Sequence, residues 1–166
     1  MAPLIICYSH TRKTMALCRK LQNTIPGTKL AEIKETAPLG KVGAYTKGLM
    51  QVFKNKLPDI TLAGGNPGEH DVLVAAGPVW ASNPAPALKR WLLDTDLSGK
   101  KLMVVLTAQK SADEAAATIP GLLEGKGLVA LEVRGLCMGK LDEAGSTPID
   151  VTPISEWLYA QTGEQC

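Results

Sequence analysis

The sequence predicts an α/β domain in which helices cover both faces of a parallel sheet. Apolar runs alternate with amphipathic helical patterns along the chain, which is the order expected of a doubly wound sheet. Three of the runs, residues 4–8, 71–76 and 101–107, are apolar at nearly every position. Runs of this kind indicate strands that are covered on both faces. The predicted architecture is therefore a three-layer αβα sandwich.

The predicted strands are short and are separated by helices whose apolar side chains share one side. The strands occupy residues 4–8, 29–33, 71–76, 101–107 and 128–133. The apolar helical positions are Met15, Cys18 and Leu21 in residues 14–23; Tyr45, Leu49, Val52 and Phe53 in residues 45–54; and Leu88, Trp91 and Leu92 in residues 85–93.

Two further helices are predicted from signals at their ends. Ser111 and Glu114 form a capping-box pattern before an alanine-rich stretch that extends to residue 124, and Pro120 is expected to kink or end that helix. The last predicted helix, residues 154–161, carries Trp157 and Leu158, with Pro153 in its first turn and Gly163 as its stop.

Two stretches fall outside this alternation. Residues 57–69 are rich in Pro and Gly and are expected to form a surface excursion. Residues 135–152 form a long connection before the last helix, and connections of that length are often functional. No linker divides the chain, so residues 1–166 are expected to fold as one domain.

Composition narrows the classes of protein to consider. A chain of 166 residues buries roughly 70% of its unfolded surface and needs no metal or disulfide to hold a core. The net charge is +2 and the basic residues are dispersed, which argues against nucleic acid as a partner. There is no basic leader and no apolar run near the roughly 20 residues that cross a bilayer, so we expect a cytoplasmic protein without a membrane span.

The cysteines and histidines give no metal or catalytic pattern. The cysteines show neither a CxxC pair nor zinc spacing with His10 or His70, so we expect reduced thiols in or near a core. His70 is expected at the surface or in a turn. His10 lies in a loop where it either donates to a ligand or faces solvent. Cys7 falls within an apolar strand, which makes a nucleophilic Cys7–His10 pair a poor hypothesis.

The loop after the first strand is the first candidate site, because ligands of open α/β sheets sit beyond the carboxyl ends of the strands. It reads Ser9-His10-Thr11-Arg12-Lys13-Thr14 and leads directly into a helix. Hydroxyls and backbone N–H groups at a helix N-terminus can bind phosphate. The alternative is that one of the hydroxyls simply caps the helix.

The loop after the third strand is the second candidate site. Gly77 is expected to allow a tight exit from the strand, and Pro84 and Pro86 stiffen the start of the next helix. We predict that Trp80 sits on this loop, where an indole can cover a flat ring. The alternative is that Trp80 folds over the end of the sheet with no ligand.

These two loops resemble those of the flavodoxin family. The resemblance lies in Pro78-Val79-Trp80, in Asn83-Pro84-Ala85-Pro86, in the helix that follows and in residues 96–101, DLSGKK. The first loop is similar to the phosphate loop of that family, S/T-x-T-G-x-T. The resemblance implies a flavodoxin-like fold with a five-stranded parallel sheet of order 2-1-3-4-5.

The resemblance also implies FMN as the cofactor. Carried over, the first loop, above all Ser9, Thr11 and Thr14 with His10, Arg12 and Lys13, holds the phosphate. Pro78, Val79, Trp80, Ala81, Ser82 and Asn83 line one side of the flavin, and the loop with Thr107, Ala108 and Gln109 meets the other side. The protein would orient the ring and tune its potential, because the redox chemistry belongs to the cofactor.

Two positions depart from the family pattern. Arg12 stands where the family usually has glycine, and a non-glycine residue with φ > 0 costs roughly 1–2 kcal/mol. The loop after the fourth strand has neither glycine nor an aromatic residue, so its backbone cannot approach a ring as closely. These departures motivate the alternative of a flavodoxin-fold binding or regulatory module that has lost flavin.

The expected function is therefore FMN-dependent redox chemistry, either electron transfer or reduction of a small molecule such as a quinone or a flavin. Electrons would come from NAD(P)H or from a redox partner protein. Electron-shuttling flavodoxins are typically acidic, whereas this chain is slightly basic, which leaves room for an NAD(P)H oxidoreductase. Related folds often dimerise, so a homodimer is one expected assembly.

Overall fold

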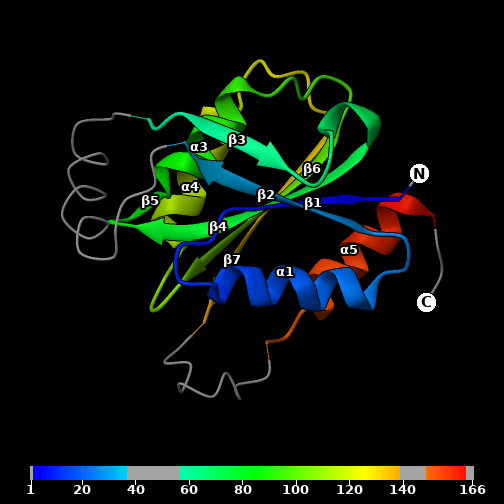
Figure 1. Cartoon of the computed structure of the whole chain (residues 1–166), viewed down its shortest axis with the longest axis horizontal. Coiled ribbons are helices and arrows are strands. Elements are labelled where there is room, and N and C mark those ends of the chain that lie inside the picture. Colours follow the sequence, from blue (N-terminus) through cyan, green and yellow to red (C-terminus); the bar gives the residue numbers. More distant parts are fainter. Residues whose placement is uncertain (1, 37–56, 139–148, 164–166) are drawn as a thin grey trace.

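The computed structural model describes residues 2–36, 57–138 and 149–163. The strands there are β1 Leu4–Cys7, β2 Lys29–Glu35, β3 Ile60–Ala63, β4 Val72–Trp80, β5 Asn83–Pro84, β6 Lys101–Ala108 and β7 Ala130–Cys137. They form one sheet in the order β3-β2-β1-β4-β6-β7, with β5 paired to β4 (Figure 1). The predicted parallel strands appear in the predicted order, as β2-β1-β4-β6-β7.

Helices cover both faces of this sheet. They are α1 Lys13–Thr24, α3 Pro86–Asp94, α4 Asp113–Leu122 and α5 Thr152–Thr162, together with a short 3₁₀ turn at Pro67–Glu69. Figure 1 shows α1 and α5 on one side of the sheet and α3 and α4 on the other. The three-layer αβα prediction is confirmed, whereas the helix predicted at residues 45–54 lies outside the described residues.

Alternate side chains of each central strand feed two separate cores. In β1, Leu4 and Ile6 pack in the core beneath α3 and α4, whereas Ile5 and Cys7 pack in the core beneath α1 and α5. All four are completely buried. Burial on both faces is what the unbroken apolar runs predicted, because successive side chains of a strand point to opposite faces.

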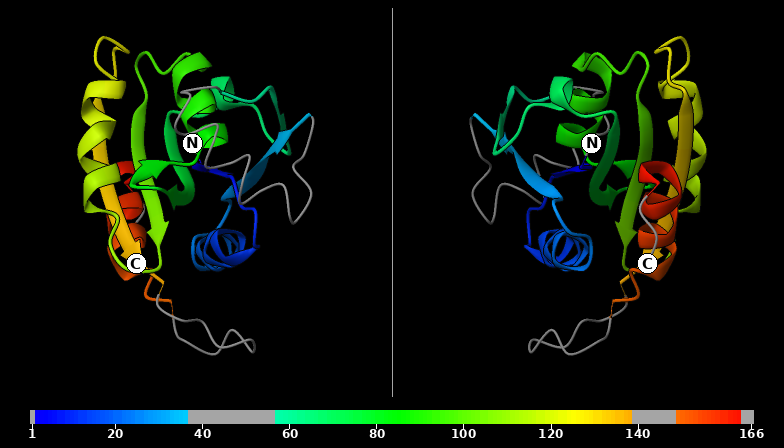
Figure 2. Two further views of the ribbon diagram at one scale, coloured as in Figure 1. Left: turned by 90° about the vertical axis from the view of Figure 1, so that its left-hand side faces the viewer. Right: turned by 90° about the vertical axis from the view of Figure 1, so that its right-hand side faces the viewer.

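The sheet has one more edge strand than predicted. The segment 57–69, predicted as a surface excursion, contributes that strand. Residues 60–63 form β3, which pairs antiparallel with β2 at the edge of the sheet. Only Ile60 and Leu62 of this strand are partly covered, and Thr61 and Ala63 face solvent. A short, half-exposed strand beside Gly64 and Gly65 leaves a weak sequence signal. In Figure 2, β3 and β2 lie at one end of the twisted sheet and β7 at the other.

Two strands continue through glycines beyond their predicted ends. β4 continues through Gly77 to Trp80, and β7 continues through Gly135 to Cys137. A Cβ on Gly77 would lie 2.8 Å from Leu88 Cδ2, and one on Gly135 would lie 2.9 Å from Ala112 Cβ. Both glycines therefore serve the close approach of a helix, not a turn.

The helix ends agree in part with the predictions. Gly163 ends α5 with φ +73°, and α4 ends at Leu122, shortly after Pro120. The capping box is wrong: Ala112 precedes α4, and the Ser111 hydroxyl accepts from the N–H of Asp113 at 3.1 Å instead of from Glu114. The Ser111 turn is one residue too tight for the predicted motif.

The thiols and His70 complete the description of the interior. Cys7 and Cys18 are buried free thiols, Cys137 is an exposed one, and Cys166 lies outside the described residues. His70 is buried, contrary to prediction, because its Nδ1 donates to the Ala2 carbonyl at 2.8 Å. Within residues 2–36, 57–138 and 149–163, no helix has both the length and the apolar character needed to cross a bilayer.

Candidate functional site

The carboxyl ends of β1, β4 and β6 bring the three predicted loops to one edge of the sheet. These strands are neighbours, and β1 pairs in parallel with both β2 and β4. The chain leaves β1 toward β2 and returns to β4 on the other side. Strand order therefore reverses between β1 and β4, which is where open α/β sheets bind ligands.

The first loop carries a buried polar atom without a partner. Within the described part of the chain, the Ser9 Oγ is buried and accepts or donates no hydrogen bond. Such atoms are uncommon and usually point to a ligand or a water. Helix α1 begins at Lys13, and no side chain caps its N-terminus. The alternative that Ser9, Thr11 or Thr14 serves as the helix cap is therefore wrong.

Arg12, which stands where the resembling loop has glycine, adopts a left-handed backbone conformation. Its φ is +65°, in the left-handed region. The guanidinium points to β2, with Nη1 3.2 Å from Glu32 Oε1, and most of the side chain is exposed. Arg12 is therefore paired with Glu32. The next cation in the loop is Lys13, which is half-buried at the start of α1.

Thr14 and Thr107 meet beneath this loop. Their Oγ1 atoms lie 2.8 Å apart, and both residues are buried. Thr107 Oγ1 also lies 3.5 Å from the Gly77 carbonyl of β4. The hydroxyl pair links α1, β6 and β4, a contact between residues that the sequence suggested only as separate ligands of a cofactor.

The second loop is a β-hairpin, which corrects the prediction that Trp80 sits on a loop. Trp80 ends β4 and pairs with Asn83, while Val79 pairs with Pro84. Ala81 and Ser82 join the strands with φ of +47° and +60°. Positive φ at both central residues is the pattern of a type I′ turn, which ordinarily favours Asn and Gly. The Asn83 side-chain amide donates to the Ala81 carbonyl at 2.8 Å.

The Trp80 indole contacts two rings from the segment that follows β1, those of Tyr8 and His10. Its centroid lies 6.0 Å from that of Tyr8, at an interplanar angle of 68°, and 6.1 Å from that of His10, at 87°. Both contacts are close to perpendicular, an arrangement that aromatic pairs favour, and they restrain the indole at the end of β4. His10 is exposed, as one of its two predicted alternatives has it, and its ring also contacts Trp80.

Tyr8 and Glu35 extend this cluster to β2. The Tyr8 hydroxyl donates to Glu35 Oε1 at 2.5 Å. Burial, and then this hydrogen bond to a carboxylate, raise the pKa of Tyr8 well above its ordinary value of 10.0. Neither Tyr8 nor Glu35 was predicted as a site residue. Tyr8 directly precedes the first loop, and that position was the available signal.

The third loop, after β6, is held near the sheet. Ala108 is half-buried, and its carbonyl accepts from the N–H of Met138 at 2.8 Å. The Cys137 thiol donates to the Lys110 carbonyl at 2.5 Å. Gln109 is exposed, as is Thr11 in the first loop. Pro78 and Val79 are half-buried in β4, and Pro78 lies beside Thr107 in the sheet register.

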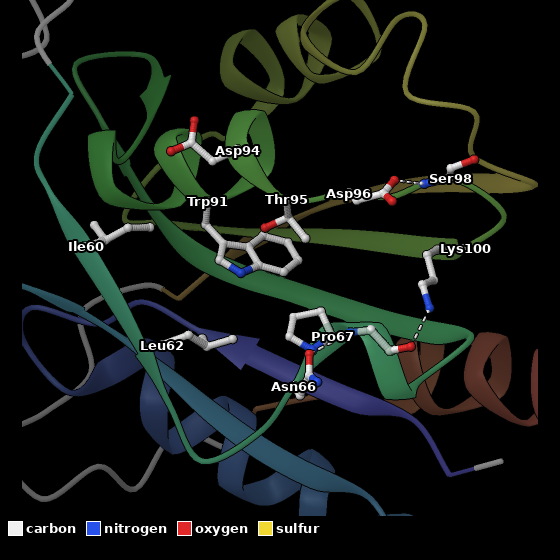
Figure 3. Close-up of a pocket in the computed structure, with 11 residues that line it drawn as sticks. Ile60, Leu62, Asn66, Pro67, Trp91, Asp94, Thr95, Asp96, Ser98 and Lys100 are labelled. Carbon is white, nitrogen blue, oxygen red and sulfur yellow. Dashed lines mark hydrogen bonds between the residues drawn. The ribbon is translucent and has the colours of Figure 1, made fainter.

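A cavity of about 620 Å³ lies elsewhere, near the amino ends of β4 and β6 (Figure 3). Trp91 and the β3 side chains Ile60 and Leu62 form its apolar wall. Two of its charged side chains already have partners: Lys100 Nζ donates to the Gly68 carbonyl at 3.2 Å, and Asp96 Oδ1 accepts from the Ser98 N–H at 3.0 Å. The cavity therefore makes a weaker candidate than the carboxyl edge.

Comparison with solved structures identifies the architecture. A flavoprotein of Lactobacillus acidophilus in complex with FMN matches with a TM-score of 0.73 and 18% identity, covering 94% of this chain and 97% of that one. The chain has a flavodoxin-like fold. A Streptococcus pneumoniae flavodoxin matches at TM-score 0.56 and 13% identity over 99% of this chain and all of its own. A Fusobacterium nucleatum flavodoxin bound to flavin mononucleotide matches at 0.54 and 14% identity over 100% of both chains.

The likeness lies in structure and not in sequence. No family model matches the chain, and no curated protein matches its sequence significantly. At identities below one fifth, the flavodoxin-like fold is what these matches establish. What the carboxyl edge binds has to be argued from its own residues.

Proposed function

We propose that this flavodoxin-like protein binds FMN at the carboxyl edge of the sheet and acts in electron transfer or in the reduction of a small molecule. The observation that carries the proposal is the unpartnered, buried Ser9 Oγ in the loop that leads into α1. A phosphate there would supply the missing acceptor for the Ser9 hydroxyl, and the positive end of the α1 dipole favours a phosphate.

The residues present fit both ends of the cofactor. Ser9, Thr11, Thr14 and the uncapped N–H groups at the start of α1 would hold the phosphate. Trp80, in near-perpendicular contact with the rings of Tyr8 and His10, would cover the ring, with Val79 beside it. The flavin would supply the redox chemistry, and the protein would exclude water from it and hold its plane. FMN bound to the solved relatives is in keeping with this assignment.

The electron donor would be NAD(P)H or a redox partner protein. The net charge of +2 differs from the acidic surface that steers electron carriers onto basic partners, which favours a small-molecule reductase over a shuttle. Oxidation of NAD(P)H by the purified protein with a quinone or a free flavin would support the reductase. A requirement for a partner protein would contradict it.

A flavin-free binding module is the competing proposal. Two observations favour it: the Arg12 guanidinium pairs with Glu32, and the Thr14 hydroxyl already has Thr107 as a partner. Fewer groups are then free to bind phosphate than the loop sequence suggests. A yellow protein as purified would eliminate this alternative.

Titration with FMN tests the proposed site. Wild-type protein should bind FMN, and Ser9→Ala should weaken binding roughly tenfold or more, since a hydrogen bond to a charged phosphate is lost. Ser98→Ala is the matched control, because Ser98 is exposed near the other edge of the sheet and should leave affinity unchanged. A colourless protein that shows no binding or thermal shift with excess FMN would contradict the proposal.

A further inference from the structure

The Thr14–Thr107 pair sets a limit on what the Thr14 hydroxyl can bind. The two Oγ1 atoms are 2.8 Å apart, so one hydroxyl donates to the other. Thr14 and Thr107 are only 2% and 5% exposed, which keeps bulk water from competing for the bond. The pair joins the first turn of α1 to β6, two elements that are far apart in sequence.

A hydroxyl carries one proton to donate and two lone pairs to accept. If Thr14 donates to Thr107, the Thr14 hydroxyl has no proton left to donate to a ligand. Thr107 can then donate to the Gly77 carbonyl, 3.5 Å away. If Thr107 donates to Thr14, the Thr14 proton remains free. A phosphate ester at neutral pH offers acceptors only, so Thr14 can bond to it only in the second arrangement.

The arrangement in which Thr107 donates to Thr14 loses only one weak contact. It gives up the contact between Thr107 and the Gly77 carbonyl, which at 3.5 Å is at the limit of hydrogen-bonding range. It also makes a chain in which Thr107 donates to Thr14 and Thr14 donates outward, and such chains polarise and strengthen one another. Binding of an anion would select it.

We propose that Thr107 is a positioning residue that turns the Thr14 proton toward the phosphate and so sets the preference for FMN over riboflavin, without itself touching the ligand. This inference rests on the proposed FMN site. It differs from the sequence prediction, in which Thr107 met the flavin directly. A merely structural pair would stabilise the fold but would not discriminate between flavins with and without phosphate.

Thr107→Val removes the hydroxyl and keeps the shape, and Thr107→Ser restores the hydroxyl. Both variants are titrated with FMN and with riboflavin, and circular dichroism establishes that they are folded. Thr107→Val should weaken the affinity for FMN about three- to tenfold and leave the affinity for riboflavin unchanged. Thr107→Ser should bind both flavins with wild-type affinity. Thr14→Val should produce the same selective loss, and the double variant should lose no more than Thr14→Val alone.

The outcomes separate the two proposals. If wild-type protein binds neither flavin, the proposed function fails, and this inference fails with it. If wild type prefers FMN but Thr107→Val keeps the same ratio of affinities, or weakens both flavins equally, only the positioning role is overturned. Should Thr107→Val not fold, Thr107→Ala gives the same comparison with a smaller side chain, and its FMN-to-riboflavin ratio decides.

Discussion

Arg12 Nη1 lies 3.2 Å from Glu32 Oε1, and the residue that makes this contact has a φ of +65°. The ion pair is exposed and contributes at most about 1 kcal/mol. A left-handed non-glycine backbone costs roughly 1–2 kcal/mol. Arg12 is therefore held by the turn from β1 into α1 and not by its own preference. Strain of this kind is found where a loop is shaped for a ligand.

Glycine and alanine at position 12 should separate strain from charge. Both Arg12→Gly and Arg12→Ala remove the ion pair with Glu32, but only glycine adopts positive φ without steric cost. We expect Arg12→Gly to be more stable than Arg12→Ala by about 1 kcal/mol in urea unfolding. Equal stability of the two variants would show that the loop relaxes to another conformation.

Glycine in the turn of the β4–β5 hairpin should increase the stability of the protein. Ser82 has a φ of +60°, and Ser82→Gly should stabilise the protein by roughly 0.5–1 kcal/mol because glycine suits the second position of a type I′ turn. Ser98→Gly is the control: its φ is not positive, so it should be neutral or destabilising. Thermal unfolding measures both. Destabilisation by Ser82→Gly would argue against the positive φ at that residue.

Tyr8 should make stability fall at alkaline pH. Its pKa is raised in the folded state, first by burial and then by the hydrogen bond to Glu35, so the folded protein favours the neutral phenol. That contribution is complete below the ordinary pKa of 10.0 and is lost as the pH rises above it. We expect the free energy of unfolding to decrease above pH 10, and to decrease less in Tyr8→Phe.

Ultraviolet absorbance of tyrosinate gives the direct readout. One of the three tyrosines should stay protonated until the protein unfolds, and Tyr8→Phe should abolish that late step. Normal titration of every tyrosine in the folded wild type would contradict the buried hydroxyl.

The thiols should differ sharply in reactivity. Cys137 is exposed, whereas Cys7 and Cys18 are fully buried, and the contact with Cys7 together with burial raises the pKa of Cys18. A maleimide should therefore label native Cys137 quickly and reach Cys7 and Cys18 only after unfolding. Peptide mass spectrometry of wild type and Cys137→Ser, which assigns each label to its own cysteine and so separates these three thiols from Cys166, checks this, and rapid native labelling of Cys7 would oppose it.

Much of the fold was predictable because its central strands are apolar on both faces. β1, β4 and β6 gave unbroken runs that only a covered parallel sheet explains. β3 was not predictable, since it is short and half-exposed and depends on β2 for its pairing. The strand ends at Gly77 and Gly135 were misplaced because glycine there serves helix packing, which local sequence does not reveal.

The candidate site was predictable in position but not in detail. The place of Ser9 after β1, and that of Trp80 at the carboxyl edge, followed from the strand pattern and from the resemblance, although Trp80 ends β4 instead of lying on a loop. The partners did not, because Arg12–Glu32, Tyr8–Glu35 and Thr14–Thr107 join residues that are distant in sequence. Such pairs exist only once the sheet order is formed. They change the roles of individual side chains within the expected region.

The most direct test of an FMN site at the carboxyl edge is a two-dimensional NMR titration of the labelled protein with FMN. We predict saturable shifts of the backbone amide signals of Ser9 to Thr14 and of Val79 to Asn83, with the amides around Asn66 and Lys100 unaffected. No shifts with excess FMN, or shifts confined to the cavity near Trp91, would contradict the account.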